Sequence, residues 1–408
     1  MYRHLMFFLA PFMVLFLLQQ TVVGQGLEGV ERAIRTARED PGDPDDGWAA
    51  ERRNVPLVRT AVRDWVLRRL PPGIVDSYRD LSSISAALND QLKKSDLYMP
   101  KGDFNDVPFR QWGYSTAIEL RRVDEVPSYI ELRISVSTAC GSDDAAYFLL
   151  WRAGRWTIPA FIDGSNNSAK FAAAVDEIKF SEADNDGNRL LLGLRQAVQC
   201  ASAWSAFTYD IFRIHPDGTA EQLSSASHGI YDGWGNLENR VLPDSVLMEF
   251  ADSSIDDAVH NRPTILHFQL QHDTLERVDP IALRPFDFVD EWWKIDWKEA
   301  VKWSSSSNSK LRSFHDTERP DQVFGEFGFV QRCKNESDWQ ISYDVDPNNV
   351  MQETAKKGIA GTIYFLIRET GKYQYLMLDV DTKRQPGCPG EDQLDIARPS
   401  LFKNPPGF

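Results

Sequence analysis

The sequence offers one group of residues that could do chemistry, a set of carboxylates beside tryptophans. On a helix, Asp287 would share a face with Asp290 and Glu291, next to Trp292 and Trp293. Paired carboxylates near aromatic rings are what glycoside cleavage and sugar binding require. A structural alternative competes, because acids in a first helical turn interact favourably with the helix dipole and tryptophans fill cores. We favour the structural interpretation and keep the three acids as the catalytic candidates.

Two other groups resemble metal ligands. Asp184, Asp186 and Asn188 alternate like part of a calcium loop, but Arg189 and Arg195 stand where such a loop needs Gly and Glu. A plain hairpin turn is therefore expected. A second group consists of irregularly spaced histidines: His228, His260, His267 and His272. Since a metal site needs three or four ligands around one ion, we predict no metal site and no cofactor.

Signatures of common enzyme classes are missing from the sequence. It contains no GxSxG serine elbow, no HExxH pair, no GxGxxG and no phosphate-binding loop with a lysine. An active site can still assemble from single residues on distant strands. Whether the protein is an enzyme thus stays open, with non-enzymatic function favoured.

The first residues read as an export signal. A short basic start at Arg3 precedes the apolar run Leu5–Leu18, and Val22 and Gly24 are the small residues that signal peptidase reads. The run is shorter than the ~20 residues of a bilayer-spanning helix. We expect residues 1–24 to be a cleaved signal peptide, which leaves a secreted or periplasmic protein without a stable membrane anchor.

Export would place the four cysteines in an oxidising compartment; they are Cys140, Cys200, Cys333 and Cys388. In an oxidising compartment an even number of cysteines suggests disulfides rather than metal ligands. Three connectivities are open. Pairing Cys140 with Cys200 and Cys333 with Cys388 is the arrangement that keeps each bridge inside one proposed domain.

The charge of the chain limits the classes of partner that it can bind. The formal net charge is −15, and such an acidic surface repels phosphate backbones and anionic lipids. We therefore predict no nucleic-acid partner, and we keep carbohydrate or another envelope protein as candidates.

The elements that would position these residues are mostly strands. Helical spacing is confined to Leu27–Arg38, Pro56–Leu70 and about Ser82–Lys94. From about Gln111 the period becomes two, as in Leu132, Ile134 and Val136, and hairpin turns recur every 20 to 30 residues. The fold class is mainly β, an antiparallel hairpin meander, sandwich or propeller-like.

These patterns divide the mature chain into four segments. The segments are a helical N-terminal segment 25–105, a main β domain 110–303 closed by a helix at 286–303, a polar linker 304–322, and a small C-terminal β domain 323–408.

Three stretches resemble a known group of proteins: ACGSDDAAYFLLWRAGRW, GNRLLLGLRQAVQCASAW and RPFDFVDEWWKIDW. They are similar to an uncharacterised family of secreted bacterial proteins over roughly residues 110–303. In that family a Cys precedes an aromatic hairpin, a second Cys precedes a Trp strand, and an acidic, aromatic helix follows. The resemblance implies a periplasmic or extracellular location but no activity.

The function expected from the sequence is that of an exported, non-enzymatic binding or structural module. It rests on the missing catalytic motifs, the paired cysteines and the strand-rich body. The alternative is a secreted polysaccharide hydrolase that uses Asp287, Asp290 or Glu291.

Overall fold

The protein is mainly β, as the sequence predicts, and its described residues form four antiparallel sheets of four strands each. The computed structural model describes the following residues: 27–40, 49–72, 74, 78–94, 113–138, 141–164, 173–197, 204–231, 237–256, 262–305, 309–317, 325–345 and 361–388. The chain divides into two compact units, 1–227 and 228–408. The predicted signal peptide, Cys140, Cys200 and His260 lie outside the described residues.

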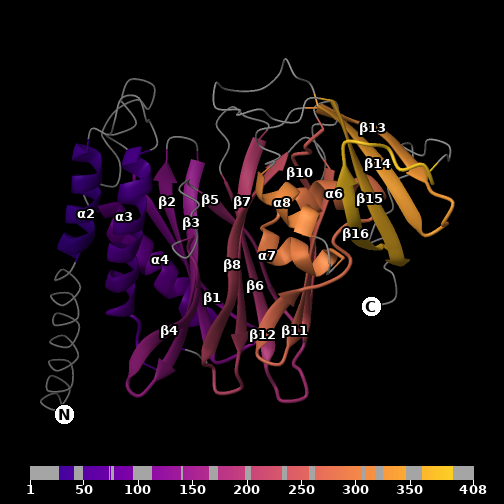
Figure 1. Ribbon diagram of the computed structural model, residues 1–408. Helices are drawn as coiled ribbons and strands as arrows, with labels where there is room; N and C mark the ends of the chain where they lie inside the picture. Colours follow the sequence, from indigo (N-terminus) through magenta and orange to yellow (C-terminus); the bar gives the residue numbers. More distant parts are fainter. Residues whose placement is uncertain are drawn as a thin grey trace, which may run out of the picture. The chain divides into compact units, whose positions relative to one another are not determined.

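Unit 1 begins with three helices: α2 (Leu27–Glu39), α3 (Ala49–Leu67) and α4 (Tyr78–Lys94). Each has a buried apolar face, for example Val30, Ile34 and Ala37 on α2. These helices cover one face of sheet 1 (Figure 1). Their apolar faces and that face of the sheet share one hydrophobic core.

The rest of unit 1 is a pair of meanders. Sheet 1 contains β1 (Thr116–Arg122), β2 (Tyr129–Thr138), β3 (Gly141–Arg152) and β4 (Arg155–Ile162); sheet 2 contains β5 (Ala173–Phe180), β6 (Arg189–Ala197), β7 (Trp204–Ile214) and β8 (Ala220–Tyr231). Phe148 and Ile162 of sheet 1 share a second core with Leu191 and Phe212 of sheet 2. Sheet 1 therefore has two buried faces, one against helices and one against a sheet.

Helix α4 also protects the edge strand β1. The side chain of Asn89 donates to the carbonyl of Ile118 (2.7 Å) and accepts from its amide (2.9 Å), as a neighbouring strand would. The hydroxyl of Ser85 accepts from the amide of Leu120 (2.9 Å). Unpaired strand edges invite pairing with other chains, so these contacts close one such edge.

Unit 2 contains the other two sheets. Sheet 3 has β9 (Glu238–Leu242), β10 (Ser245–Asp252), β11 (Arg262–Gln271) and β12 (Thr274–Arg277); sheet 4 has β13 (Gly325–Arg332), β14 (Asp338–Val345), β15 (Gly361–Gly371) and β16 (Gln374–Asp381). Between them come α6 (Pro285–Lys294), α7 (Trp297–Ala300), a 3-10 turn at Val301–Trp303 and α8 (Ser309–Thr317).

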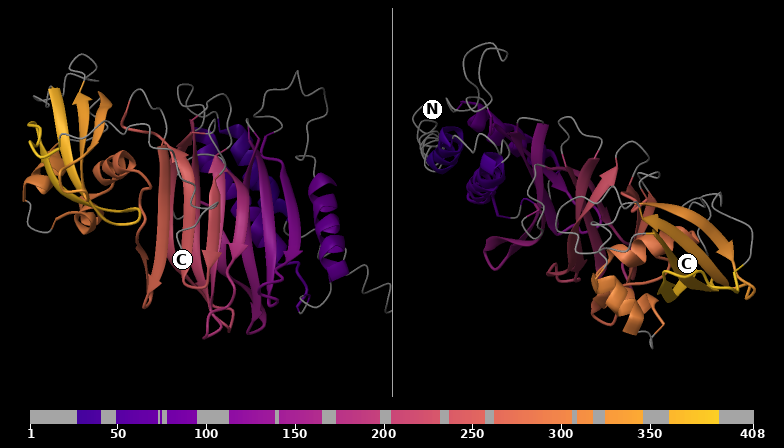
Figure 2. Two further views of the ribbon diagram at one scale, coloured as in Figure 1. Left: turned by 90° about the vertical axis from the view of Figure 1, so that its right-hand side faces the viewer. Right: turned by 45° about the horizontal axis from the view of Figure 1, so that its top comes forward.

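The helices of unit 2 pack on one face of sheet 4, as two further views show (Figure 2). Trp293 of α6 packs edge-to-face against Tyr343 and at a tilt against Phe365, with ring centroids 5.5 and 5.4 Å apart. Phe314 of α8 lies 5.7 Å from the same Phe365. Aromatic rings thus form the core of this unit.

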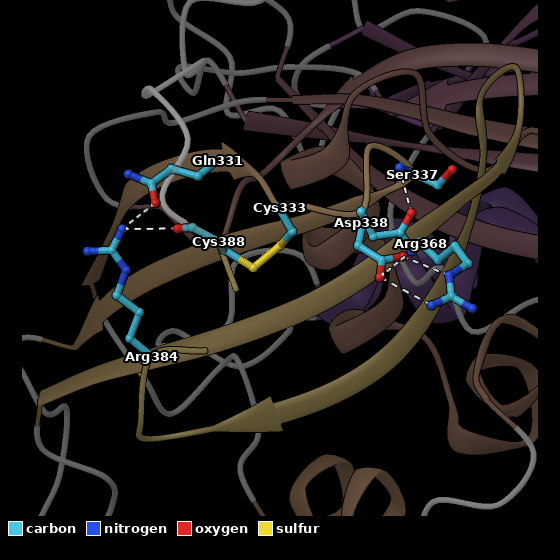
Figure 3. The surroundings of a disulfide bond; sticks show 8 residues. Gln331, Cys333, Ser337, Asp338, Arg368, Arg384 and Cys388 are labelled. Atoms are coloured by element: carbon cyan, nitrogen blue, oxygen red, sulfur yellow. Dashed lines mark hydrogen bonds and ion pairs between the residues drawn. A yellow bond between two sulfur atoms is a disulfide. The ribbon is translucent and has the colours of Figure 1, made fainter. Parts of the chain in front are cut away.

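A disulfide links the segment that follows β16 to the end of the edge strand β13 (Figure 3). Cys333 follows the edge strand β13, and Cys388 ends a segment that leaves β16 at the opposite edge. Arg384 of this segment hydrogen-bonds to Gln331 (2.6 Å) and lies over the ring of Phe329. The predicted link between Cys333 and Cys388 is confirmed.

Several elements differ from the sequence expectations. Helix α3 starts at Ala49, with Pro56 inside it, and α4 starts one turn earlier than expected. The helix expected at 286–303 is interrupted at Ile295, whose extended backbone ends α6.

The segment 304–322, expected to be a polar linker, contains α8. Leu311 and His315 are buried and Phe314 is partly buried, so three apolar or aromatic side chains at helical spacing anchor a helix whose other residues are polar. The boundary between the two compact units falls after Ser227, inside the segment 110–303 treated above as one domain. This boundary falls within β8, so no turn or linker marks it in the sequence.

Within the ranges described above, every helix is too short or too polar to cross a lipid bilayer.

Candidate functional site

The three candidate carboxylates lie on α6 and point into the protein. Asp287, Asp290 and Glu291 have exposed fractions of only 0%, 1% and 3%. Arg284, at the start of the helix, binds both oxygens of Asp287 at 2.7 and 2.9 Å. A bidentate pair of this kind holds the Asp287 carboxylate in place at the helix N-terminus.

Asp290 fixes the chain segment that follows β10. One carboxylate oxygen accepts hydrogen bonds from the Ser254 hydroxyl (2.9 Å) and the Ile255 amide (2.7 Å). The other contacts Arg262 of β11 and Lys294, one turn further along α6. Asp290 therefore joins the helix, the segment and sheet 3.

Glu291 lies between two arginines of sheet 3. Its carboxylate is 2.5 Å from Arg262 and 2.6 Å from Arg277. Burial alone would raise the pKa of Glu291, but the charges of Arg277 and Arg262 outweigh it and lower the pKa to about 2. The group is ionised at any physiological pH.

The sequence thus predicts correctly that the three acids share a helix. Their contacts, however, hold the fold together. Every one of the carboxylates has an arginine partner. A sugar would have to displace these partners to reach them, and breaking a buried ion pair costs about 3–5 kcal/mol. The arrangement connects α6 to sheet 3 and to the segment before it.

The neighbouring tryptophans belong to the core. Trp292 is fully buried, and its ring nitrogen donates to the Ser304 hydroxyl (2.8 Å). Trp293 is 1% exposed and lies among Phe314, Tyr343 and Phe365. Neither side chain presents a ring face to a ligand.

The residues considered for calcium form a hairpin turn. Between β5 and β6, one oxygen of Asp184 accepts from the amides of Asp186 (2.9 Å) and Asn188 (2.7 Å). Its other oxygen accepts from the side chain of Asn188 (3.0 Å). An aspartate whose side chain accepts hydrogen bonds from backbone amides a few residues later is typical of a tight turn. The carboxylate oxygens of Asp184 therefore stabilise this hairpin turn.

The histidines do not gather around one point in the part of the chain that the structure covers. The ring of His228 packs against Phe250, and His267 contacts the Asp279 carbonyl through Nδ1. His272 occupies the turn between β11 and β12 with a positive φ. No group of three metal-binding side chains occurs among the described residues.

A buried ionic cluster in unit 1 escaped the sequence reasoning. Asp143 of β3 contacts Arg59 of α3 and lies 2.8 Å from Arg195 of β6. Arg59 also donates to the Asp163 carbonyl (2.8 Å), and Arg195 to the Asp144 carbonyl (2.9 Å). The cluster joins all three layers of the unit. Its one sequence signal is a charged residue in an apolar strand, as Arg195 is in β6.

Unit 2 contains a groove large enough to receive a small ligand. It has a volume of about 490 Å³ and lies between α8 and sheet 4. Hydroxyl groups one helical turn apart form one wall, namely those of Ser309, Ser313 and Thr317. The apolar floor consists of Phe314, Ile363 and Val380. Ligand sites commonly have this size and combine an apolar floor with a few polar groups.

An ion pair closes one side of this groove. Lys310 lies 2.6 Å from Asp381 and 3.1 Å from Asp379, and Lys310 and Asp381 line the groove. Burial lowers the pKa of Lys310, but its hydrogen bonds to the two aspartates raise it further, so the pKa stands above its usual value. The rim therefore carries one positive and two negative charges.

The comparisons with known proteins do not name a function. No family model matches the chain, and no curated protein sequence is similar to it. The site chemistry must therefore carry any functional conclusion.

Proposed function

We propose that this chain is an exported, non-enzymatic binding module, and that the groove beneath α8 holds its ligand. The observation that carries the proposal is the groove itself, with a row of helix hydroxyls above an apolar floor. The buried acids of α6 support the non-enzymatic part of the proposal indirectly, because they form ion pairs with arginines that stabilise the fold.

The groove favours a neutral, polyhydroxylated ligand, such as the end of a polysaccharide chain. The hydroxyls of Ser309 and Ser313 can each donate to and accept from a sugar hydroxyl. The Thr317 hydroxyl donates to the Ser313 carbonyl (2.6 Å) and offers a sugar an acceptor. The C–H faces of a sugar ring fit against apolar side chains such as Phe314 and Val380. Asp379 and Asp381 at the rim would repel an anionic ligand.

A glycan array probed with the mature protein, starting at Gln25, tests this proposal. We expect retention of neutral glycans by the wild type and loss of retention in Ser313→Trp, whose indole would fill the groove. Arg312→Trp is the matched control, because Arg312 is exposed on the same helix and does not line the groove. Its ion pair with Asp316 is exposed and contributes little.

Two results would contradict the proposal. One is the absence of glycan binding by the folded wild type. The other is equal binding by Ser313→Trp and the wild type, which would place the ligand elsewhere. If the wild type instead captures a specific envelope protein and Ser313→Trp does not, the groove is still the binding site but its ligand is a protein.

A further inference from the structure

The segment between β12 and α6 contains a peptide bond that can react with its own side chain, Asp279–Pro280. An aspartate carboxyl reaches its own backbone carbonyl carbon, because attack of the one on the other closes a five-membered ring. The nitrogen of the following proline carries no hydrogen and is more basic than other amide nitrogens, so it leaves readily. Bonds between aspartate and proline are therefore the peptide bonds that acid breaks most easily.

His267 of β11 contacts the carbonyl oxygen of this bond. Its Nδ1 lies against the Asp279 oxygen, which can only accept, so Nδ1 carries a proton and donates the hydrogen bond. The amide of Val278 donates to the His267 carbonyl (2.8 Å), which fixes the two segments side by side. A donor on a carbonyl oxygen stabilises the negative charge that forms there during attack on the carbon. His267 thus activates one particular bond between aspartate and proline.

The carboxyl group of Asp279 is available for this attack. Within the described residues no hydrogen bond or ion pair holds it, and burial raises its pKa. A carboxyl that stays protonated in mild acid brings the proton that the leaving nitrogen needs. The charged groups near His267 are Asp244, which favours the protonated ring, and Arg240, which lines the same face of sheet 3. Since Nδ1 keeps its proton in both charge states of the ring, the contact persists in acid.

We propose that this chain cleaves itself between Asp279 and Pro280 in mildly acidic surroundings. A carboxyl oxygen of Asp279 bonds to the Asp279 carbonyl carbon, the C–N bond to Pro280 breaks, and the carboxyl proton moves to the Pro280 nitrogen. The products are a cyclic anhydride at Asp279 and a chain that begins with the secondary amine of Pro280. Water then opens the anhydride to two carboxyl groups. The reaction takes place once in each chain, so it is compatible with a non-enzymatic binding function.

The cut lies between the partners of buried ion pairs in unit 2. Arg262 and Arg277 precede it in the sequence, and Glu291, which contacts both, follows it. These contacts should hold the two pieces together in the folded protein. Cleavage is therefore expected to become visible only after denaturation.

Mass spectrometry of the wild-type mature protein, incubated at pH 5 and then denatured and reduced, tests this inference without any mutation. Three other bonds between aspartate and proline, after Asp40, Asp43 and Asp346, serve as internal references. In the folded protein we expect a new N-terminus at Pro280 and at least about tenfold slower cleavage at the references, because one donor at a developing oxyanion changes a rate by about 10²–10³. In urea this preference should disappear. No cut after Asp279 in the folded protein, or the same preference in urea, would overturn the inference.

Variants then assign the two roles. Asp279→Ala lacks the carboxyl and should abolish the cut, whereas His267→Phe lacks the donor and should slow it at least about tenfold. Glu276→Ala is the matched control, because Glu276 is exposed on β12 three residues before Asp279 and should leave the rate unchanged. A cut at the wild-type rate in Asp279→Ala, or in a folded His267→Phe, would contradict the mechanism. Ser313→Trp, which blocks the groove under α8, should cleave like the wild type, so the two proposals can fail independently.

Discussion

The guanidinium of Arg262 and the carboxylate of Glu291 lie 2.5 Å apart, and their side chains are only 2% and 4% exposed. Removing one partner of such a pair leaves the other charge buried without compensation. This relationship gives α6 its fixed position on sheet 3, and it makes the acids of the helix the first residues to test.

Glu291→Gln should destabilise the protein by about 3–5 kcal/mol, because Arg262 and Arg277 lose their shared carboxylate. Urea denaturation measures the change. Glu299→Gln is the control, since Glu299 is 31% exposed and 3.3 Å from Arg277, and it should cost less than about 1 kcal/mol. A stable Glu291→Gln variant that had lost a hydrolytic activity of the wild type would instead favour a polysaccharide hydrolase.

Asp210→Asn should stabilise the protein at pH 7 and have little effect near pH 4. Burial raises the pKa of Asp210 to about 6, from 3.8. Between these values the folded state holds a proton that the unfolded state lacks, so stability falls as pH rises through this window. The asparagine cannot ionise and should recover up to about 3 kcal/mol at pH 7.

Thermal unfolding of Asp210→Asn and wild type at both pH values checks this. Gln222 donates to the Asp210 carboxylate at 3.1 Å, and the asparagine oxygen can accept the same bond. A stability difference that is the same at pH 4 and pH 7 would show that Asp210 does not titrate between them.

Replacing both Cys333 and Cys388 by serine should destabilise unit 2 by about 4 kcal/mol, because the bond closes a loop with a sequence separation of 55. The measurement is denaturant unfolding followed by tryptophan fluorescence, to which Trp292 and Trp293 in the core of this unit contribute among the 12 tryptophans of the chain. Addition of a reductant to the wild type should give at least as large a loss, because it would also reduce the bond expected between Cys140 and Cys200. Unchanged unfolding of the double variant would contradict the prediction.

Non-reducing peptide mapping of the protein folded under oxidising conditions should find Cys140 linked to Cys200. Three residues after Cys140, Asp143 lies 2.8 Å from Arg195, which is five residues before Cys200. This ion pair joins β3 and β6 at the strand ends that lead toward the two cysteines. A peptide that links Cys140 to Cys333 or Cys388 would exclude this arrangement.

The N-terminal residue of the exported protein should be Gln25. Signal peptidase recognises small side chains such as Val22 and Gly24 after an apolar run. Intact-mass measurement of the protein secreted by an expressing cell decides the question. Recovery of the chain with residues 1–24 still attached to membranes would show that the leader is an anchor.

The regular parts of the fold follow from local patterns. Leu132, Ile134 and Val136 alternate with polar residues and form β2, buried on the alternating side. The hairpin between β3 and β4 turns at Ala153 and Gly154, which both have positive φ, as a two-residue turn requires. Both features depend on residues close together in the sequence.

The features that the sequence did not predict depend on distant partners. Helix α8 looks polar in sequence and forms because Leu311 and His315 reach a core made by other elements. The acids of α6 resemble a catalytic pair until Arg262 and Arg277, from two different strands, are placed beside Glu291. No local pattern encodes those contacts. The groove likewise combines α8 with separate strands of sheet 4.

The disulfide between Cys333 and Cys388 also determines how the protein would respond to mechanical force. A pull on the C-terminal end of the chain reaches Cys388 first and passes through the sulfur atoms to Cys333. The force therefore bypasses β14, β15 and β16, which lie between the two cysteines in the sequence. An exported protein tethered by its C-terminus could bear tension while three strands of sheet 4 remain unloaded.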